Sequence, residues 1–310
     1  MATLMEKDAL LNGASQCIAF LSEACGNIDN SEALNLSQDI NQCITYRDYL
    51  YSTDADEVNF NEGVVRFKYL REKYYSTNTT HHNIDINDDP FESVWRRLTK
   101  RVLTSQAQPV GFVLGGQPGA GKSLLIKHAL VRTDFNALVI NGDDFRFHHP
   151  DFQAIYATYG DDFVSHTAQF SGEMVERVLK KAIENKYNIV IEGTFRNADT
   201  PMQTLKRLKE AGYRAEVMIK TTSATKGWRQ TNERYDNDKL AGNIARKVDK
   251  NHHDLVIAVL AENAKKVFDS GLADAFSAWS CEGNIFDSQA ASATDIEEKI
   301  RDEICKTVTA

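Results

Sequence analysis

The sequence predicts an α/β protein with a mostly parallel sheet flanked by helices, preceded by an all-helical N-terminal segment. Two observations support this fold class. After residue 85, short apolar runs alternate with helical patterns, which is typical of a parallel sheet covered on both faces. Residues 4 to 75 instead space their apolar side chains three and four positions apart, as amphipathic helices do.

Three helices are predicted in the N-terminal segment. They correspond to "MEKDALLNGASQCIAFLSEA", "SEALNLSQDINQCITYRDYLY" and "FNEGVVRFKYLREKYYS". Residues 1–85 contain 13 acidic and 6 basic residues, a net charge of −7, whereas residues 86–310 contain 31 and 30. The acidic excess of the chain is therefore a property of its N-terminal segment.

A polar stretch, "STNTTHHNIDINDDP", follows these helices and is predicted to be a linker or long loop. It sets the predicted domains: a helical segment over 1–85, an α/β domain over 86–290 and a charged C-terminal helix over 291–310. In the α/β domain, a helix "FESVWRRLTKRVL" precedes the strand "PVGFVLG". Strands "NALVIN", "YNIVIEG" and "YRAEVMIK" follow, and "SAWSCEGNIFD" is expected to form a strand pair or an edge piece.

The first strand leads into a phosphate-binding motif. The stretch from Gly116 to Ser123 fits G-x-x-x-x-G-K-[ST] and lies between a strand and a helix, as the chemistry requires. Its backbone N–H groups can surround phosphate oxygens, Lys122 can reach the β- and γ-phosphates, and Ser123 can bind Mg²⁺. The predicted ATP-binding residues are Gly116, Gln117, Pro118, Gly119, Ala120, Gly121, Lys122, Ser123 and Leu124.

Acidic residues follow the second strand in "NGDDFR". In a parallel sheet, Asp143 and Asp144 then lie at the carboxyl edge beside the phosphate loop. A carboxylate there can orient an attacking hydroxyl group or remove its proton. The same residues could equally form a solvated turn or a helix cap.

Two further segments carry candidate polar ligands. Glu192, Thr194 and Arg196 follow the strand "NIVIE" and should lie at the same edge, although Thr194 could be a helix cap and Arg196 a surface residue. Arg234 and Arg246 lie in a polar helix–loop–helix segment of the kind that closes over ATP. Position alone also allows these two arginines to be solvated.

Composition excludes several other classes of protein. No apolar run is long enough to span a membrane and the N-terminus has no signal pattern, so a cytoplasmic location is expected. The near-neutral α/β domain argues against a nucleic-acid partner. Five widely spaced cysteines suggest no disulfide framework, and the paired histidines, including His252 and His253, are interpreted as surface or turn residues.

In combination, these motifs resemble those of the zeta toxin family of P-loop kinases. The matching stretches are "GGQPGAGKS", "NGDDFRFHHPDF", "IVIEGTFRN", "ERYDND" and "ARKVDKNHHD", and the similarity extends from about Phe91 to Ser288. The resemblance implies an ATP- and Mg²⁺-dependent kinase that phosphorylates a sugar hydroxyl of UDP-N-acetylglucosamine. The product cannot enter peptidoglycan synthesis, so such an enzyme acts as a toxin in a toxin–antitoxin system.

The resemblance also assigns roles residue by residue. The catalytic residues it implies are Lys122, the base Asp143, and the two lid arginines Arg234 and Arg246. Glu192, Thr194 and Arg196 correspond to the substrate-binding residues, and Ser123 to the metal ligand. Asp144 replaces a residue that is often Thr in relatives, so it is not the expected base.

The sequence departs from the family in its first 85 residues, since members of the plasmid type begin close to the first strand. We expect the acidic helical segment to inhibit the kinase from within the chain, although it could instead stabilise the fold or promote oligomerisation. Whether a separate antitoxin also binds this chain stays open. Two other functions also stay open: a kinase of another small-molecule or polynucleotide acceptor, and an ATP-hydrolysing regulatory switch.

Overall fold

The computed structural model describes residues 11, 39–47, 49–50, 89–99, 103–240, 243–289 and 295–306. The chain divides into two compact units, one formed by Asp89–Asn232 with Lys247–Ala310, the other by Met1–Asp88 with Glu233–Arg246. The predicted N-terminal helices and linker lie mostly outside the described residues, and those described at 39–47 and 49–50 are helical. The predicted domain boundaries stay a prediction.

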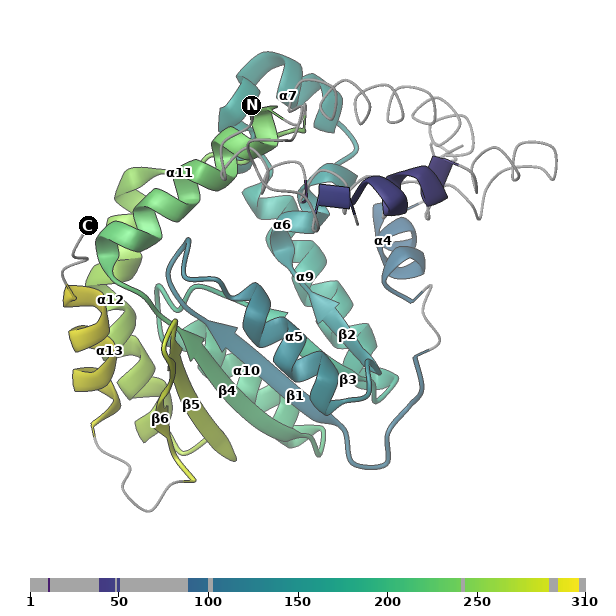
Figure 1. Cartoon of the computed structure of the whole chain (residues 1–310). Helices are drawn as coiled ribbons and strands as arrows, with labels where there is room; N and C mark the ends of the chain where they lie inside the picture. Colours follow the sequence, from purple (N-terminus) through teal and green to yellow (C-terminus); the bar gives the residue numbers. More distant parts are fainter. Residues whose placement is uncertain are drawn as a thin grey trace. The chain divides into compact units, whose positions relative to one another are not determined.

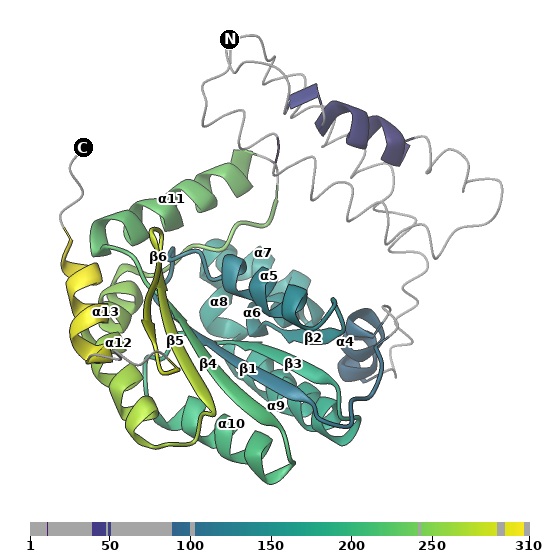
Figure 2. The same cartoon turned by 60° about the horizontal axis from the view of Figure 1, so that its bottom comes forward.

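The larger unit contains a six-stranded sheet with the order β2-β3-β1-β4-β5-β6, which confirms the predicted α/β class (Figures 1 and 2). Strands β1 to β5 run parallel, and β6 pairs antiparallel with β5 at the edge. The strands are β1 (Val110–Gly115), β2 (Ala137–Ile140), β3 (Asn188–Glu192), β4 (Arg214–Lys220), β5 (Ala275–Ser280) and β6 (Gly283–Asp287). Each predicted strand is present, and the last predicted stretch forms a strand pair.

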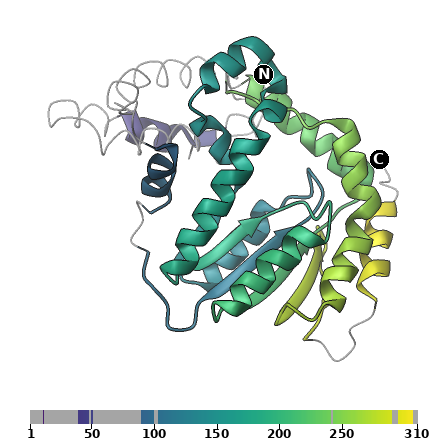
Figure 3. The same ribbon diagram turned by 180° about the vertical axis from the view of Figure 1, so that it is seen from behind.

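Helices cover both faces of this sheet, as its apolar strands require. Helix α5 (Ser123–Arg132) packs on the face that carries Phe112 and Leu114 of β1. Helices α9 (Ala168–Glu184), α10 (Asp199–Glu210) and α12 (Lys250–Asp269) pack on the opposite face with Val113. Figure 1 shows α5 over one face, and Figure 3 shows the other three helices from behind.

Further α-helices occur among the described residues. They are α4 (Pro90–Leu98), α6 (Gly142–Phe145), α7 (Phe152–Tyr159), α8 (Phe163–His166), α11 (Ala224–Leu240) and α13 (Ile296–Cys305). The Asp89 carboxylate caps α4 by accepting a hydrogen bond from the backbone N–H of Phe91, and Pro90 occupies its first turn. Helix α13 buries Ile296, Ile300 and Ile304 in the same core as the sheet, so it is part of the larger unit.

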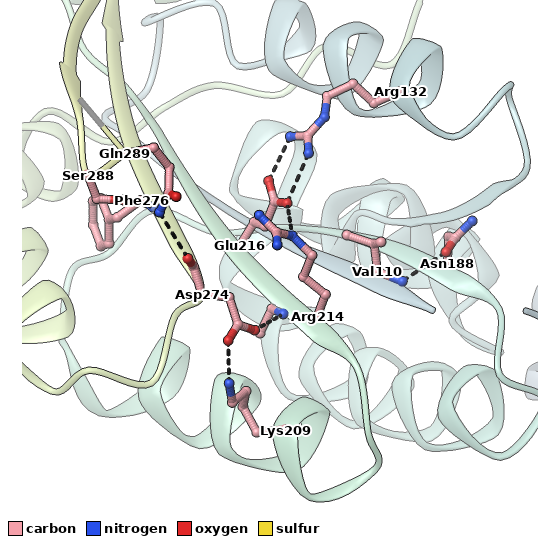
Figure 4. A network of polar contacts seen from close by, with 11 residues as sticks. Val110, Arg132, Asn188, Lys209, Arg214, Glu216, Asp274, Phe276, Ser288 and Gln289 are labelled. Atoms are coloured by element: carbon pink, nitrogen blue, oxygen red, sulfur yellow. Dashed lines mark hydrogen bonds and ion pairs between the residues drawn. The ribbon is translucent and has the colours of Figure 1, made fainter. Parts of the chain in front are cut away.

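The amino-terminal edge of the sheet is held by a network of polar contacts around Glu216 (Figure 4). Arg132 donates two hydrogen bonds to the Glu216 carboxylate, at 2.6 and 2.9 Å, and Arg214 donates a third at 2.8 Å. Nearby, the Asp274 carboxylate accepts from Lys209 Nζ at 2.5 Å and from the backbone N–H of Ala215 at 2.8 Å. These contacts tie α5, α10 and the start of β4 together.

In the part of the chain that the structure describes, no helix is both long enough and apolar enough to cross a membrane.

Candidate active site

The phosphate loop connects β1 to α5 at the carboxyl-terminal edge of the sheet. Gly116 and Gly119 have φ angles of 143° and 77°, which glycine adopts without strain. A side chain at either position would collide with the backbone, because the Cβ atom would lie 2.0 Å from the carbonyl oxygen of Lys220 or Gly227. The loop is therefore fixed between the end of β4 and the first turns of α11.

Lys122 bends back over this loop. Its ammonium donates to the carbonyl oxygens of Gly116 at 3.0 Å and Gln117 at 3.2 Å, and it lies 3.8 Å from Glu192 Oε1. Helix α5 starts immediately after Lys122 without a side-chain cap, so the positive end of its dipole faces the loop. The loop thus offers both a lysine and a helix terminus to an anion.

Asp143 is held in place from two sides. The Asn141 side chain caps α6 by accepting from the backbone N–H of Asp143 at 3.1 Å. Arg146 Nε donates to Asp143 Oδ1 at 2.9 Å, while its Nη1 donates to the carbonyl oxygen of Val164 at 2.7 Å and to Thr167 Oγ1 at 3.2 Å. The guanidinium is fixed by α8 and the residue that ends it, and in turn fixes the orientation of the carboxylate.

Asp144 lies in a different environment from its neighbour. Its side chain reaches solvent, yet desolvation by the surrounding protein raises the pKa of the carboxyl. Attraction to Arg97 opposes this shift and repulsion from Glu192 adds to it. Asp144 is therefore the carboxylate that the structure places near Glu192, while Asp143 is paired with Arg146.

The loop after β3 carries the remaining predicted ligands. Glu192 and Thr194 are partly buried and Arg196 is exposed. Between the last two, Phe195 adopts a left-handed φ of 57° although its ring is buried, which is unusual for a bulky residue and costs about 1–2 kcal/mol. Asn263 Nδ2 of α12 donates to the Phe195 carbonyl oxygen at 3.0 Å and so stabilises this conformation.

The first turn of α12 brings two histidines to the same edge, so the interpretation of this pair as surface residues is wrong. His253 is 1% exposed, and its Nδ1 lies 3.3 Å from Asp254 Oδ1. His252 is partly buried, and its pKa is lowered by desolvation and by the nearby cations Arg196 and Lys122. Two adjacent histidines carry no sequence pattern that distinguishes this arrangement from a solvated turn.

Arg234 lies in α11, and Arg246 lies before α12, in described residues that form neither helix nor strand. Both belong to the smaller compact unit, which contains Glu233–Arg246. The assignment of these two arginines to a transferring phosphate therefore stays a prediction.

The comparisons with known proteins agree with this arrangement. A family model described as zeta toxin matches residues 95–279. Toxin PezT of Streptococcus pneumoniae is 34% identical over 189 residues, covering 59% of this chain and 74% of the relative. Toxin zeta of Streptococcus pyogenes is 31% identical over 234 residues, covering 73% and 80%.

The chain belongs to the zeta toxin family. The family model matches more than half of the chain, and the resemblance inferred from the motifs is confirmed. A solved structure agrees: the chain from the PezAT chromosomal toxin–antitoxin system of Streptococcus pneumoniae aligns with a TM-score of 0.62 and 27% identity, covering 72% of this chain and 90% of that one. The zeta toxin family consists of kinase-like toxins of toxin–antitoxin systems.

Within this zeta toxin fold, three side chains at the site were not found by sequence analysis. Arg146 orients Asp143, Asn263 holds the Phe195 carbonyl, and His252 lies near Lys122 and Arg196. Arg146 is only three positions from Asp143, but the contacts that fix its guanidinium are with Val164 and Thr167, 18 and 21 positions away, and Asn263 is 68 positions from Phe195. No local sequence pattern identifies these contacts. No group of three or more His, Cys, Asp or Glu residues with a metal-binding arrangement occurs among the described residues.

Proposed function

We propose that this chain is an ATP-dependent phosphotransferase that phosphorylates a sugar hydroxyl of UDP-N-acetylglucosamine and thereby acts as a toxin that blocks cell-wall synthesis. The observation that carries the proposal is the 3.8 Å approach of Lys122 to Glu192, in a chain of a kinase-like toxin family. Because of this contact, the phosphate loop lies beside the loop that is predicted to hold the acceptor. As an enzyme of ATP and a sugar nucleotide, it would act in the cytoplasm.

The phosphate loop would bind the triphosphate of ATP from Gly116 to Leu124. Its backbone N–H groups and the N-terminus of α5 favour anionic oxygens, and Lys122 would contact the β- and γ-phosphates. The Ser123 hydroxyl, at the start of α5, is a hard oxygen donor of the type that Mg²⁺ prefers, so the donor set fits the ion. When bound, Mg²⁺ would offset charge on the β- and γ-phosphates.

Asp143 would act on the acceptor. Its carboxylate orients the sugar hydroxyl and takes its proton as the hydroxyl oxygen bonds to the γ-phosphorus. The bond between the γ-phosphorus and the bridging oxygen breaks, and ADP leaves with that oxygen. Arg146 supports this role because its hydrogen bond holds the carboxylate in one orientation.

The remaining predicted residues would bind either the acceptor or the transferring phosphoryl group. Glu192, Thr194 and Arg196 would hold the acceptor, with Asn263 and Phe195 fixing the shape of their loop. Arg234 and Arg246 would close on the transferring phosphoryl group as parts of a lid. Phosphoryl transfer would occur only when the lid is closed and brings these two arginines to the phosphate.

We also propose that the N-terminal segment restrains this kinase within the chain. Supporting this, Met1–Asp88 and Glu233–Arg246, which carries both lid arginines, form one compact unit. The segment is strongly acidic, with a net charge of −7 over residues 1–85, so it would compete with phosphates for cationic side chains. A family relative comes from a toxin–antitoxin system, so a separate antitoxin could also bind.

The test is mass spectrometry of UDP-N-acetylglucosamine incubated with ATP and Mg²⁺, using the full chain and a form that starts at residue 86. Phosphorylated product from the short form, and much less from the full chain, would support both proposals. Adding residues 1–85 as a separate peptide should then restore inhibition. Thermal unfolding of both forms checks that the deletion leaves the kinase folded.

Other outcomes point elsewhere. Equal product from both forms would keep the kinase and reject the inhibitor. No product from either folded form would reject UDP-N-acetylglucosamine as the acceptor, and profiling of other hydroxyl acceptors would follow. ATP hydrolysis without any phosphorylated acceptor would favour a regulatory switch.

A further inference from the structure

The phosphate loop and the loop predicted to hold the acceptor follow neighbouring strands of the sheet. Strands β1 and β3 pair in parallel, and Glu192, the last residue of β3, lies opposite Leu114 of β1. The backbone N–H of Gly193 donates to the Leu114 carbonyl oxygen at 2.9 Å, so the contact between the two segments continues past the end of β3. The backbone of Glu192 is therefore fixed beside a residue of β1 that lies two positions before Gly116.

Lys122 reaches back from the other end of the phosphate loop to the same place. Its ammonium donates to the carbonyl oxygens of Gly116 and Gln117, at 3.0 and 3.2 Å, and lies 3.8 Å from Glu192 Oε1. The side chains of Lys122 and Glu192 are 10% and 23% exposed, so water screens the attraction between them only in part. The ion pair therefore joins the cation expected to contact ATP to a carboxylate expected to contact the acceptor.

This ion pair connects the binding of the two ligands. A triphosphate in the loop would draw the Lys122 ammonium toward its β- and γ-phosphate oxygens, which together carry more negative charge than one carboxylate. The sugar acceptor can use the full charge of Glu192 only when Lys122 no longer balances it, because charge-assisted hydrogen bonds are stronger than neutral ones. The nucleotide would thus prepare a binding group for the sugar acceptor.

We propose that Glu192 exchanges partners when a nucleoside triphosphate binds, from Lys122 to a hydroxyl or amide N–H of the acceptor, so that the nucleotide raises the affinity of the site for the acceptor. The proposal rests on the proposed function, because it needs both ligands at this edge of the sheet. By thermodynamic linkage, the acceptor raises the affinity for the nucleotide by the same factor. The site then holds its sugar nucleotide tightly only beside ATP.

The exchange has a consequence that a simple binding role for Glu192 lacks. If Glu192 only bound the acceptor, its substitution would weaken acceptor binding equally with and without the nucleotide. In the exchange, the charge of Glu192 contributes to acceptor binding only after Lys122 has turned to the phosphates. Removing the ammonium with Lys122→Met should also release Glu192, so that the carboxylate contributes to acceptor binding even when no nucleotide is added.

Isothermal titration calorimetry measures both effects. The full chain is titrated with UDP-N-acetylglucosamine in the presence of Mg²⁺, alone and after saturation with a non-hydrolysable ATP analogue. We expect the analogue to raise the acceptor affinity of the wild-type chain about tenfold more than it raises that of Glu192→Gln. Without the analogue, Glu192→Gln should change the acceptor affinity less than about threefold by itself, and lower it about tenfold in a chain that carries Lys122→Met.

Two matched variants act as controls. Thr194→Val removes a hydroxyl from the same loop and should weaken acceptor binding by the same factor with and without the analogue. Asp144→Asn removes an exposed carboxylate at the same edge of the sheet and should retain the wild-type effect of the analogue. Glu192 is partly exposed, so Glu192→Gln is expected to fold, as thermal unfolding checks, and Glu192→Ala serves the same comparison if it does not.

The outcomes are distinct. An effect of the analogue that is lost in Glu192→Gln and retained in Asp144→Asn and Thr194→Val would support the proposal. Equal effects of the analogue in the wild-type chain and Glu192→Gln would overturn this inference and leave the proposed function intact. An equal loss in Asp144→Asn would also overturn it, because the general charge of the edge would then explain the coupling. Failure of the folded wild-type chain to bind UDP-N-acetylglucosamine, with or without the analogue, would overturn both together.

Discussion

The two edges of the same sheet differ in whether their buried polar groups have hydrogen-bond partners. At the amino-terminal edge, both oxygens of the buried Glu216 carboxylate accept hydrogen bonds from guanidinium groups (Figure 4). At the carboxyl-terminal edge, four buried atoms near the phosphate loop have no partner within the described residues. They are Gln117 Oε1, Thr221 Oγ1, Thr222 Oγ1 and His253 Nε2.

This difference matters because each buried polar group without a partner costs about 1–3 kcal/mol. A sheet edge that only stabilises the fold is expected to satisfy its polar groups, as the edge at Glu216 does. An edge that binds a ligand keeps polar and charged groups whose hydrogen-bond partners are supplied by the ligand. Without the ligand, these groups lower the stability of the fold. The comparison therefore predicts that substitutions at the two edges separate activity from stability.

The largest effect is expected from removing the lysine of the phosphate loop. Lys122→Met should lower the rate of phosphoryl transfer by about 10³-fold, because the transferring group loses a positive charge in the site. The melting temperature should change little, since Lys122 makes its contacts with loop carbonyls and with the partly exposed Glu192. Steady-state kinetics and calorimetry measure the two quantities, and a large loss of stability would contradict the proposed division between the edges.

The two adjacent aspartates provide a matched pair at the same edge. Asp143→Asn should lower kcat by about 10²-fold or more, because the amide cannot accept the proton of the acceptor hydroxyl. Asp144→Asn should retain a rate within about threefold, as expected for a residue outside the proton transfer. Comparable losses in both variants would show that the Arg146 contact does not identify the base.

At the opposite edge, Glu216→Gln should affect stability and leave catalysis unchanged. Burial alone would raise the pKa of Glu216, but hydrogen bonds from Arg132 and Arg214 outweigh burial and lower it. Breaking these contacts should cost about 2 kcal/mol, a modest value because both guanidiniums are partly exposed and water can solvate them. Urea unfolding measures the difference in unfolding free energy.

The same carboxyl gives a pH dependence with a defined sign. Because its folded-state pKa is depressed, Glu216 contributes stability above its unfolded pKa of about 4.3, and this contribution is lost as pH falls through the folded pKa. The wild-type chain should thus lose stability more steeply than Glu216→Gln between about pH 5 and pH 3. Parallel curves for the two proteins would exclude Glu216 as a source of acid sensitivity.

The two edges also differ in how far the sequence predicts them. Local patterns were sufficient for the phosphate loop, because strand, glycine turn, lysine and helix are contiguous. They were also sufficient for the strands, whose apolar runs stand between helical patterns. The contacts of Glu216 join residues up to 84 positions apart, and no periodicity relates Arg132 to β4.

Sequence analysis missed side chains within the site for the same reason, because their roles depend on how distant segments pack together. Asn263 looks like one polar residue in an amphipathic helix, and its role follows only from the left-handed backbone of Phe195. His252 and His253 are adjacent, yet one packs beside the phosphate loop while the other lies near two cations. Sequence specifies which groups exist at this edge, and only the packing of α12 specifies what they face.

The smallest expected effect tests the comparison most directly. Thr222 is 3% exposed and its hydroxyl has no partner among the described residues, so Thr222→Val replaces it with an isosteric methyl group at no cost in hydrogen bonding. We expect the free energy of unfolding to rise by about 1 kcal/mol. Thr204 is also buried, at 6% exposed, and its hydroxyl donates to the Thr200 carbonyl oxygen at 3.1 Å, so Thr204→Val should lower the free energy of unfolding by about 1 kcal/mol. Changes of opposite sign in the free energy of unfolding, measured with urea, would support the view that the ligand-binding edge is less stable because its polar groups lack partners. Equal losses in both variants would mean that the Thr222 hydroxyl is satisfied in solution, by a water molecule for example, and that the two edges differ less than their protein contacts indicate.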